Sequence, residues 1–532
     1  MTTASTADFD PSAIADKTGN AALRDWLAIA GGMVGCFMAI LDIQITNSSL
    51  APIEGGMGAS VDEGSWISTA YLIAEIVVIP LTGWLSTVFG LKRYLAVNTA
   101  LFVLFSIGCA QSTSMIDLIL FRTGQGFTGG VLIPTGLSVI RRHLPPHQQP
   151  IGIALFGMSA TFAPAIGPTL GGWLTENFSW HYIFYLNVFP GFLAIALQLY
   201  ALAPERMRLR ALMDGDWWGI GSMAIGLGAI TVVLEEGQRH EWFDSPLICG
   251  LTVIAVICLT FFFIIEFTAR HPFINLRLFA KPAIGWSNLL STVVGAVSYG
   301  SLFLIPVYLA TIPRFSTQQI GAVVMWSGLP QLVIFPLIPL MLRTLPPRLM
   351  VGIGIALFAL SSFVNADLTH DVGMNELIVP QVIRAVAFPF FAVPLFQLAI
   401  VGLSIRDTAD SASLSNICRN LGGSIGIALL STITQSREKV HFAAIAERVT
   451  ANATNTTSRI GEMSGLFAQR TGDAGIAPIQ AVAQIAGEMH REASVMAYSD
   501  AFMVLAVLLV LSLPTIFLLP NAKPSGDVAP AH

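Results

Sequence analysis

Long apolar runs separated by short polar segments make up most of the chain. A helix that crosses the hydrocarbon core of a bilayer needs about 20 apolar residues, and lipid leaves backbone groups no partner except each other. The pattern therefore predicts an all-α polytopic membrane protein. It places fourteen transmembrane helices at residues 27–50, 66–87, 94–112, 116–139, 151–174, 182–202, 217–235, 247–267, 286–311, 320–342, 349–366, 378–402, 413–434 and 498–519.

The positions of Lys and Arg predict the orientation. With fourteen spans both termini lie on one side, and sixteen Lys and Arg residues fall in the tails and short loops of that side. The short loops of the other side hold two, Arg239 and Arg314. Because short cytoplasmic loops carry the excess of positive charge, we expect both termini in the cytoplasm of a bacterium and the chain in its inner membrane.

Composition agrees with this interpretation. Of the 532 residues, 54% are hydrophobic and 11% are charged, whereas soluble proteins carry about 25% charged residues. A basic stripe for nucleic acid is absent, and the five cysteines lack the spacing of a metal or disulfide site. The sequence also lacks a phosphate-binding loop, a zinc triplet and a nucleophile elbow. We therefore expect a protein that is not an enzyme and needs no cofactor.

The spans predict the domain organisation. Polar tails are expected at 1–26 and 520–532. An arginine followed by a proline occurs in the fourth span (Arg122, Pro134) and again in the twelfth (Arg384, Pro394). A pair of glycines occurs in the fifth span (Gly171-Gly172) and again in the thirteenth (Gly422-Gly423). Such repeats are typical of transporters with a binding site between two halves. They indicate six-helix halves at 27–202 and 286–519, with two inserted helices in 203–285.

The polar segment 435–497, between the last two spans, lies on the outer side in this topology. Residues 441–449 and 479–496 within it have helical patterns. Long loops are often functional, so the segment is interpreted either as a docking surface for a periplasmic partner or as a helical hairpin that only connects two spans. The sequence favours neither.

Charged residues inside the spans are the strongest chemical signal, because burying a charge in lipid costs at least a few kcal/mol. Asp42 lies in the first span, one turn before Asn47. Its carboxyl is interpreted as a group that binds and releases a proton during transport; the alternative is a carboxylate held permanently by an arginine or by helix-end donors. Glu75 in the second span is a second candidate proton carrier, or else a hydrogen-bonded packing residue.

Two arginines accompany these acids. Arg122, in the fourth span, cannot lose its proton and must find an acceptor, so Asp42 is its expected partner. The alternative is an anchor to backbone carbonyls. Arg384 in the twelfth span is assigned to the substrate cavity or to gating, together with the polar residues Gln44, Asn47 and Gln125.

The fifth span carries a face of small residues. Two prolines bend the helix, and glycines one turn apart allow another helix to approach closely and to slide. We interpret this face as a gate between the halves, with close packing alone as the alternative; its residues are Pro164, Gly167, Pro168, Gly171 and Gly172.

Together these motifs resemble the fourteen-helix drug:proton antiporters of the major facilitator superfamily, the EmrB/QacA family, most closely over residues 36–190. The similar stretches are those around Asp42, residues 79–85, Arg122 with Gln125 and Gly126, residues 167–172, and residues 184–188. Two departures stand out: Gln44 replaces a threonine, and Thr87 and Val88 replace the aspartate and arginine that usually close the cytoplasmic gate.

The resemblance implies a major facilitator fold and export of amphipathic drugs or toxic small molecules in exchange for protons. It further implies a periplasmic adaptor and an outer-membrane channel as partners of the segment 435–497. An exporter dedicated to one metabolite, such as a siderophore or a fatty acid, is the nearest alternative. A membrane receptor without transport is a third, which the intramembrane acid argues against.

Overall fold

The computed structural model describes residues 20–145, 147–213, 215–268, 275–400, 403, 405–449, 454–471, 473 and 475–519, so most of the two predicted tails lies outside the described residues. Regular structure in these segments is entirely helical, which confirms the all-α prediction. The first part of the chain forms α2 (Leu23–Ser48), α3 (Leu50–Met57), α4 (Val61–Phe89), α5 (Leu91–Ala110), α6 (Met115–His143), α7 (Gln149–Asn177), α8 (His181–Tyr185) and α9 (Val188–Ala201).

The remaining helices follow in two groups. The middle of the chain forms α10 (Arg210–Met213), α11 (Trp217–Glu236), η1 (Trp242–Asp244), α12 (Pro246–Thr268) and η2 (Leu276–Ala280). The last part forms α13 (Pro282–Thr311), α14 (Thr317–Val324), η3 (Met325–Ser327), α15 (Gln331–Met341), α16 (Pro347–Val364), α17 (Met374–Ile400), α18 (Ile405–Arg448), α19 (Thr454–Thr471), α20 (Ala477–Ser512) and η4 (Leu513–Leu518).

Twelve helices of the described segments are long and apolar enough to cross a membrane. The predicted spans 116–139 and 413–434 are not among these twelve and lie in α6 and α18, which are helical but more polar. The polytopic helical class is therefore confirmed, and the number of fourteen spans stays a prediction.

Side-chain caps explain where several helices begin. The Ser60 hydroxyl accepts from the backbone N–H of Glu63, while the Glu63 carboxylate accepts from the N–H of Ser60, forming a capping box at the start of α4. At the starts of α6 and α11 the side chains of Ser114 and Asp216 each accept from the backbone N–H three residues later, without the reciprocal bond. These caps satisfy backbone donors that have no partner within the helix, so short polar residues between apolar runs fix the helix starts.

Glycines let the helices of the bundle approach closely. A Cβ added at Gly126 of α6 would lie 2.3 Å from the carbonyl oxygen of Tyr71 in α4. On the other side of the molecule, one added at Gly422 of α18 would lie 2.1 Å from the carbonyl of Thr292 in α13. Both contacts are backbone to backbone, so a larger side chain would push the paired helices apart.

One apolar cluster joins helices from the two ends of the sequence. Phe335 and Ile338 of α15 pack with Ile140 of α6 and Phe156 of α7, at the end of the bundle where α2 begins. All four side chains are buried. A second cluster lies wholly within helices α13 to α20 and η4. The contact between the first and last parts of the chain is therefore a continuous apolar seal at this end.

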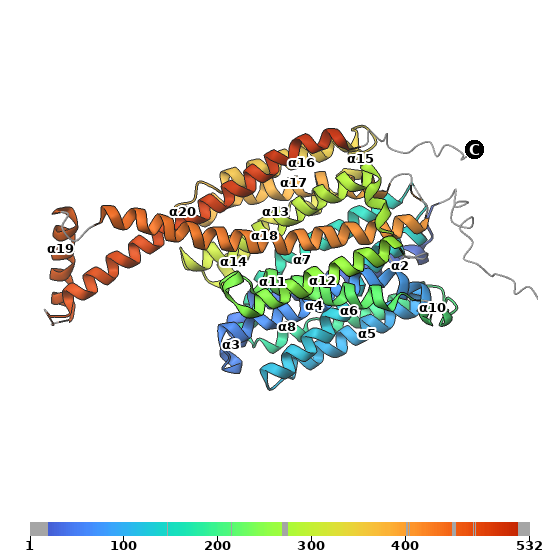
Figure 1. Cartoon of the computed structure of the whole chain (residues 1–532), viewed down its shortest axis with the longest axis horizontal. Coiled ribbons are helices and arrows are strands. Elements are labelled where there is room, and N and C mark those ends of the chain that lie inside the picture. The colour runs from blue at the N-terminus through green and yellow to red at the C-terminus, as the bar shows by residue number, and fades with distance from the viewer. Residues whose placement is uncertain are drawn as a thin grey trace, which may run out of the picture.

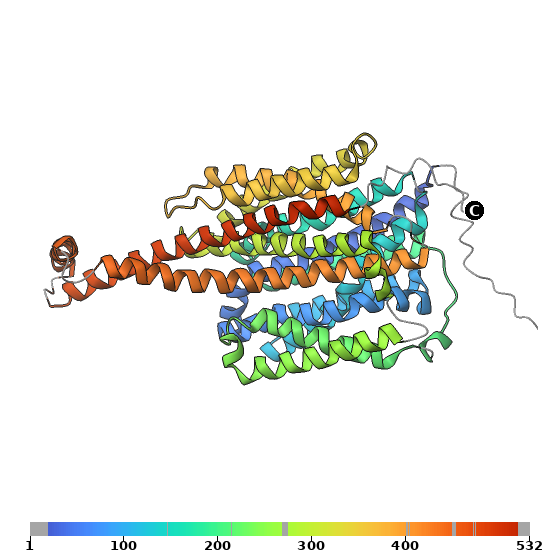
Figure 2. The ribbon, with the colours of Figure 1, turned by 45° about the horizontal axis from the view of Figure 1, so that its top comes forward.

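A helical hairpin projects far beyond the bundle at its opposite end (Figure 1). It consists of the outer parts of α18 and α20, with α19 lying across its tip (Figures 1 and 2). The segment 435–497 is thus mostly a continuation of two bundle helices. Its charges pair within the hairpin: Asp500 accepts from Arg437 and His441, and Glu488 pairs with Arg459.

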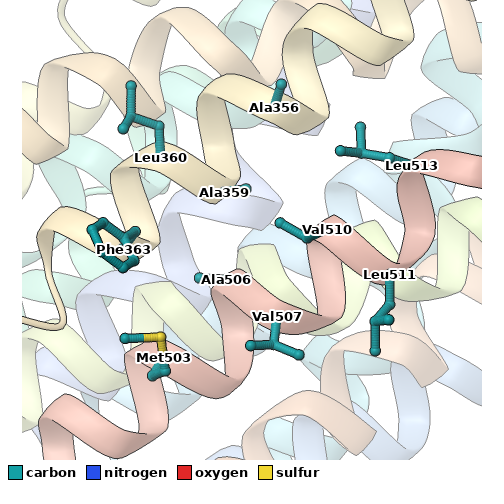
Figure 3. Close-up of a pocket in the computed structure, with 10 residues that line it drawn as sticks. All are labelled: Ala356, Ala359, Leu360, Phe363, Met503, Ala506, Val507, Val510, Leu511 and Leu513. Atoms are coloured by element: carbon teal, nitrogen blue, oxygen red, sulfur yellow. The ribbon is translucent and has the colours of Figure 1, made fainter.

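Of the two long helices in the middle of the chain, α11 lies beside α4, and α12 lies against α11. α11 packs against α4, α12 and α18, while α12 faces outward: only 17% of its most apolar stretch is buried. Between α16 and α20 a groove of about 500 Å³ is lined by apolar side chains (Figure 3). Phe363 and Leu511 on its rim are 58% and 69% exposed, so this groove faces the surrounding lipid.

Candidate functional site

The predicted pair of intramembrane charges is in contact. Arg122 of α6 donates from Nη1 to Oδ2 of Asp42 in α2, and the two side chains are 0% and 1% exposed. A buried ion pair loses its hydration and is held only where further hydrogen bonds satisfy both groups. The remaining contacts of each partner therefore decide what the pair can do.

The carboxylate of Asp42 accepts from two neutral amides as well. Gln125 of α6 donates from Nε2 to Oδ1 at 2.9 Å, and Asn187, at the start of α9, donates from Nδ2 to Oδ1 at 2.6 Å. Both amides also donate to the hydroxyl of Ser106 in α5. The carboxylate thus links α2 directly to α6 and to the start of α9, and Ser106 joins α5 to this network through the two amides.

The guanidinium of Arg122 has four other contacts, and the most distant is the Phe184 ring, whose centre lies 5.8 Å from Cζ. Its Nε donates to the carbonyl of Ile67 at 3.2 Å, its Nη1 donates to Oε1 of Gln125 at 2.8 Å, and its Cζ lies 4.4 Å from the centre of the Tyr71 ring. Its Nη2 has no hydrogen-bond partner among the described residues. Arg122 therefore both pairs with the acid and anchors to a backbone carbonyl.

Glu75 lies elsewhere on α4 and is 5% exposed. The positive charges that act on it are those of Arg419 in α18 and, to a smaller extent, Arg122. Arg419 belongs to the last part of the chain and Arg122 to the first, so Glu75 is influenced by one positive charge from each part. It is separate from the hydrogen bonds around Asp42.

The small residues of α7 divide between two neighbours. A Cβ at Gly167 would lie 2.7 Å from Cβ of Gln44, and one at Gly171 would lie 2.6 Å from the Ser48 hydroxyl, so both glycines pack on α2. On the other side of α7, Thr169 contacts Gly321 of α14. α7 therefore connects the helix that carries Asp42 to a helix from the last part of the chain.

The other predicted site residues are dispersed. Asn47 is exposed near the end of α2 and accepts from the Ser68 hydroxyl at 2.6 Å. Arg384 of α17 is 6% exposed and donates to Ser301 of α13, well away from the Asp42 pair in the fold. The remaining three lie within α7, where one is partly buried and two are buried: Pro164, Pro168 and Gly172.

Residues 32–427 match the Major Facilitator Superfamily. The chain belongs to this superfamily. It is 32% identical over 499 residues to the colistin resistance protein EmrB of Acinetobacter baumannii, covering 93% of this chain and 96% of that protein. It is 29% identical to the multidrug export protein EmrB of Escherichia coli, over 93% and 96% of the two chains. The fatty acid resistance protein FarB of Neisseria gonorrhoeae is 28% identical, over 94% and 96%.

A solved structure supports the fold. The crystal structure of the peptide transporter POT in complex with sulfate aligns with a TM-score of 0.59 at 14% identity, over 96% of this chain and 100% of that one. At this identity the likeness concerns the fold alone. The chain is therefore an EmrB-like efflux transporter of the major facilitator superfamily, with many spans in the bacterial inner membrane.

Sequence reasoning missed part of the site. Asn187 was seen only as part of a motif, and Ser106 not at all, because neutral polar residues do not stand out in an apolar run. Residues 83–93, where this member departs from the usual superfamily pattern, form the end of α4 and the start of α5, and an acid from outside this stretch contacts them. Glu205, which follows α9, accepts from the N–H of Leu91 at 3.1 Å and from Arg142 at 3.0 Å.

Proposed function

We propose that the protein is a proton-coupled antiporter that exports amphipathic drugs or toxic small molecules by alternating access, with both termini in the cytoplasm. The observation that carries the proposal is the Asp42 carboxylate, fully buried among Arg122, Gln125 and Asn187. An acid in this setting can gain a proton and release its ion pair. The guanidinium of Arg122 then keeps its charge and must rely on Gln125 and the carbonyl of Ile67.

A chain of contacts runs from this acid to the boundary between the two proposed halves, 27–202 and 286–519. Gln44, two residues after Asp42, packs on Gly167 of α7, and Thr169 of the same helix packs on Gly321. A proton at Asp42 therefore acts on a helix that contacts the other half. Coupling further requires that substrate and proton prefer different conformations, because a ligand bound equally by both drives nothing.

The test is substrate transport in everted membrane vesicles that hold an imposed pH gradient. Asp42→Asn keeps the size and part of the hydrogen bonding of the side chain but cannot bind a proton. We expect it to reduce pH-driven uptake of ethidium, a fluorescent lipophilic cation, to the level of vesicles without the protein. The matched control is Asp371→Asn, whose carboxylate is 85% exposed and far from the pair. Wild-type uptake by Asp42→Asn would contradict the proposal.

The projecting hairpin favours a tripartite assembly with a periplasmic adaptor and an outer-membrane channel. On the outer side of the membrane it would reach into the periplasm, and its self-paired charges stiffen it (Figure 2). Leu466 of the tip helix α19 is 61% exposed. We expect Leu466→Glu to abolish co-purification with an adaptor while leaving ethidium uptake by vesicles intact. Undiminished co-purification would argue against the tip as the docking point.

The likeness to FarB favours one second candidate, an exporter that serves fatty acids. The two functions differ in what competes for transport. An exporter of many drugs should be inhibited by several unrelated lipophilic compounds, whereas a dedicated fatty acid exporter should be inhibited only by amphipathic carboxylates of similar chain length. Uptake of ethidium and of a labelled fatty acid in the same vesicles, each with both classes of competitor, separates the two, because a dedicated fatty acid exporter takes up only the fatty acid.

A further inference from the structure

The first and fourth spans of the two proposed halves carry matching positions. In the first half these spans lie in α2 and α6, and Arg122 of α6 donates to Asp42 of α2. In the second half they lie in α13 and α17, and Arg384 of α17 donates from Nη1 to the hydroxyl of Ser301 in α13. Asp42 and Ser301 each lie nineteen residues after the first residue of their helix. The second half therefore repeats the arginine but has a neutral serine where the first half has a carboxylate.

The helices around Arg384 supply no counter-charge. α17 packs on α13, α14, α15 and α16, and none of these four helices contains an aspartate or a glutamate. The only acid of α17 is Glu376, an exposed residue about two turns before Arg384. The remaining acids on helices packed against α17 are Glu176 in α7 and Asp407, Asp410, Glu438 and Glu447 in α18. Within the described segments, Arg384 forms no ion pair.

A second polar side chain beside Arg384 also lacks a partner. Gln381 lies one turn earlier on the same face of α17 and is fully buried. Neither its Nε2 nor its Oε1 has a hydrogen-bond partner among the described residues. A buried amide without a partner is costly, and a buried charge without an opposite charge is more so. Because 6% of the Arg384 side chain is still exposed, whereas Arg122 is completely buried, the second arginine borders open space.

The face of α17 becomes apolar directly after the arginine. Phe388 lies one turn beyond Arg384 on the same face and is half-buried. The centre of its ring is 5.1 Å from that of Phe391 and 6.4 Å from that of Phe335 in α15. A positive charge with free donors is thus followed by an aromatic surface, an arrangement that suits a molecule with an anionic head and an apolar body.

We propose that Arg384, Ser301 and Gln381 bind the carboxylate of an amphipathic substrate, which takes the place that the Asp42 side chain has in the first half. A guanidinium offers parallel N–H donors that fit a carboxylate, and the serine hydroxyl and the glutamine amide each have a proton to donate. Phe388 contacts the apolar body. The inference rests on the proposed function, since it adds amphipathic anions to the exported molecules, but it does not depend on Asp42 as the proton carrier.

Equilibrium binding of tritiated octanoate to purified full-length protein, measured by scintillation proximity, tests the site. We expect saturable binding that unlabelled octanoate displaces and octanamide, the neutral amide of the same length, does not. Arg384→Gln should weaken octanoate binding at least tenfold, because hydrogen bonds to a charged group contribute more than those between neutral groups. Arg459→Gln, which removes an exposed arginine of the hairpin, is the control and should bind like wild type.

Ser301→Asp tests the site without removing the arginine, and so decides the matter even if Arg384→Gln does not fold. The new carboxylate should pair with Arg384 as Asp42 pairs with Arg122. We expect this variant to lose saturable octanoate binding while its Tm is at least as high as that of wild type. A Tm well below wild type would show that the guanidinium does not accept a carboxylate at this position, and would overturn the site.

Other results would overturn it as well: no saturable octanoate binding by wild type, wild-type affinity in Ser301→Asp, or displacement by octanamide as effective as by octanoate. Equally tight binding of acetate and chloride would mean a site for small anions only, against an amphipathic substrate. Octanoate binding without pH-driven ethidium uptake would support this site and refute the proposed function. Ethidium uptake without octanoate binding would do the reverse.

Discussion

Breaking the Asp42–Arg122 pair should destabilise the first half of the protein more than any other single charge change. Both side chains are fully buried, and removal of one partner of such a pair costs about 3–5 kcal/mol because it leaves an uncompensated charge. Arg122→Gln leaves the carboxylate with Gln125 and Asn187 as donors. Asp42→Asn leaves a guanidinium that cannot lose its proton. The double variant leaves neither charge, so we expect it to be more stable than either single variant.

Thermal unfolding in detergent micelles, followed by tryptophan fluorescence, measures these differences. A cooperative unit of 150–250 residues, such as the proposed half 27–202, loses about 2–4 °C in Tm per kcal/mol. Each single variant should therefore unfold about 6–20 °C below wild type, and the double variant by clearly less. The control is Arg459→Gln, which removes a pair whose arginine is 62% exposed and should shift Tm by at most a few degrees.

Comparing the two single variants with the double variant tests whether Asp42 and Arg122 are energetically coupled. If the pair is coupled as the geometry requires, the two single costs exceed the double cost by several kcal/mol. Additive shifts in Tm would mean that the residues stabilise the fold independently, through Gln125, Ile67 and Asn187. That result would refute a coupled ion pair, and with it the idea that a proton at Asp42 changes the state of Arg122.

Two further substitutions probe the end of the bundle where α2 begins. Gly157→Val places a Cβ 2.4 Å from the Phe335 ring, so the apolar seal between the halves cannot close there. We expect ethidium uptake to fall at least tenfold with unchanged membrane expression. Normal uptake would contradict the seal. Glu205→Ala removes the acceptor of Leu91 and Arg142 and should lower Tm by a few degrees, matching about 1–2 kcal/mol; an unchanged Tm would show that this acceptor is dispensable.

The sequence predicted those parts of the fold and the site that one physical constraint determines. Long apolar runs can only be helices in lipid, and they are. A charge inside such a run needs a partner, so two charges of opposite sign in different spans, Asp42 and Arg122, pointed to each other before any geometry was known. Their contact in the structure follows from that energetic necessity.

Other parts of the site depend on neighbours that the sequence does not reveal. Asn187 and Ser106 carry no charge, and an isolated amide or hydroxyl in an apolar run can satisfy itself on its own helix. Their role around Asp42 emerges only when α5 and α9 converge with α2. Likewise the small face with Gly167 and Gly171 is interpreted from the sequence as a gate between the halves or as close packing alone. Helical spacing does not say which neighbour such a face meets, and in the structure both glycines pack on α2.

Glu236 of α11 shows the same limit at the end of a span. At the close of the run 217–235 it looks like a solvated residue of a loop. The structure buries Glu236, and its carboxylate accepts from the Thr69 hydroxyl of α4, a residue 167 positions earlier in the chain. No local pattern could have revealed contacts that depend on how distant helices assemble.

Helix α18 unites these observations mechanically. It is a single helix of 44 residues, about 66 Å long. Along it lie Arg419, whose charge acts on Glu75, then Thr432, which accepts from the indole N–H of Trp242, and finally one of the two long helical segments of the projecting hairpin. The sequence suggested a span followed by a loop, but an uninterrupted helix is stiff where a loop is not. Movement of α18 against α4 at the boundary between the halves must therefore displace the hairpin tip as well. A partner docked there would sense the state of the transporter through the same helix whose Arg419 acts on the buried Glu75.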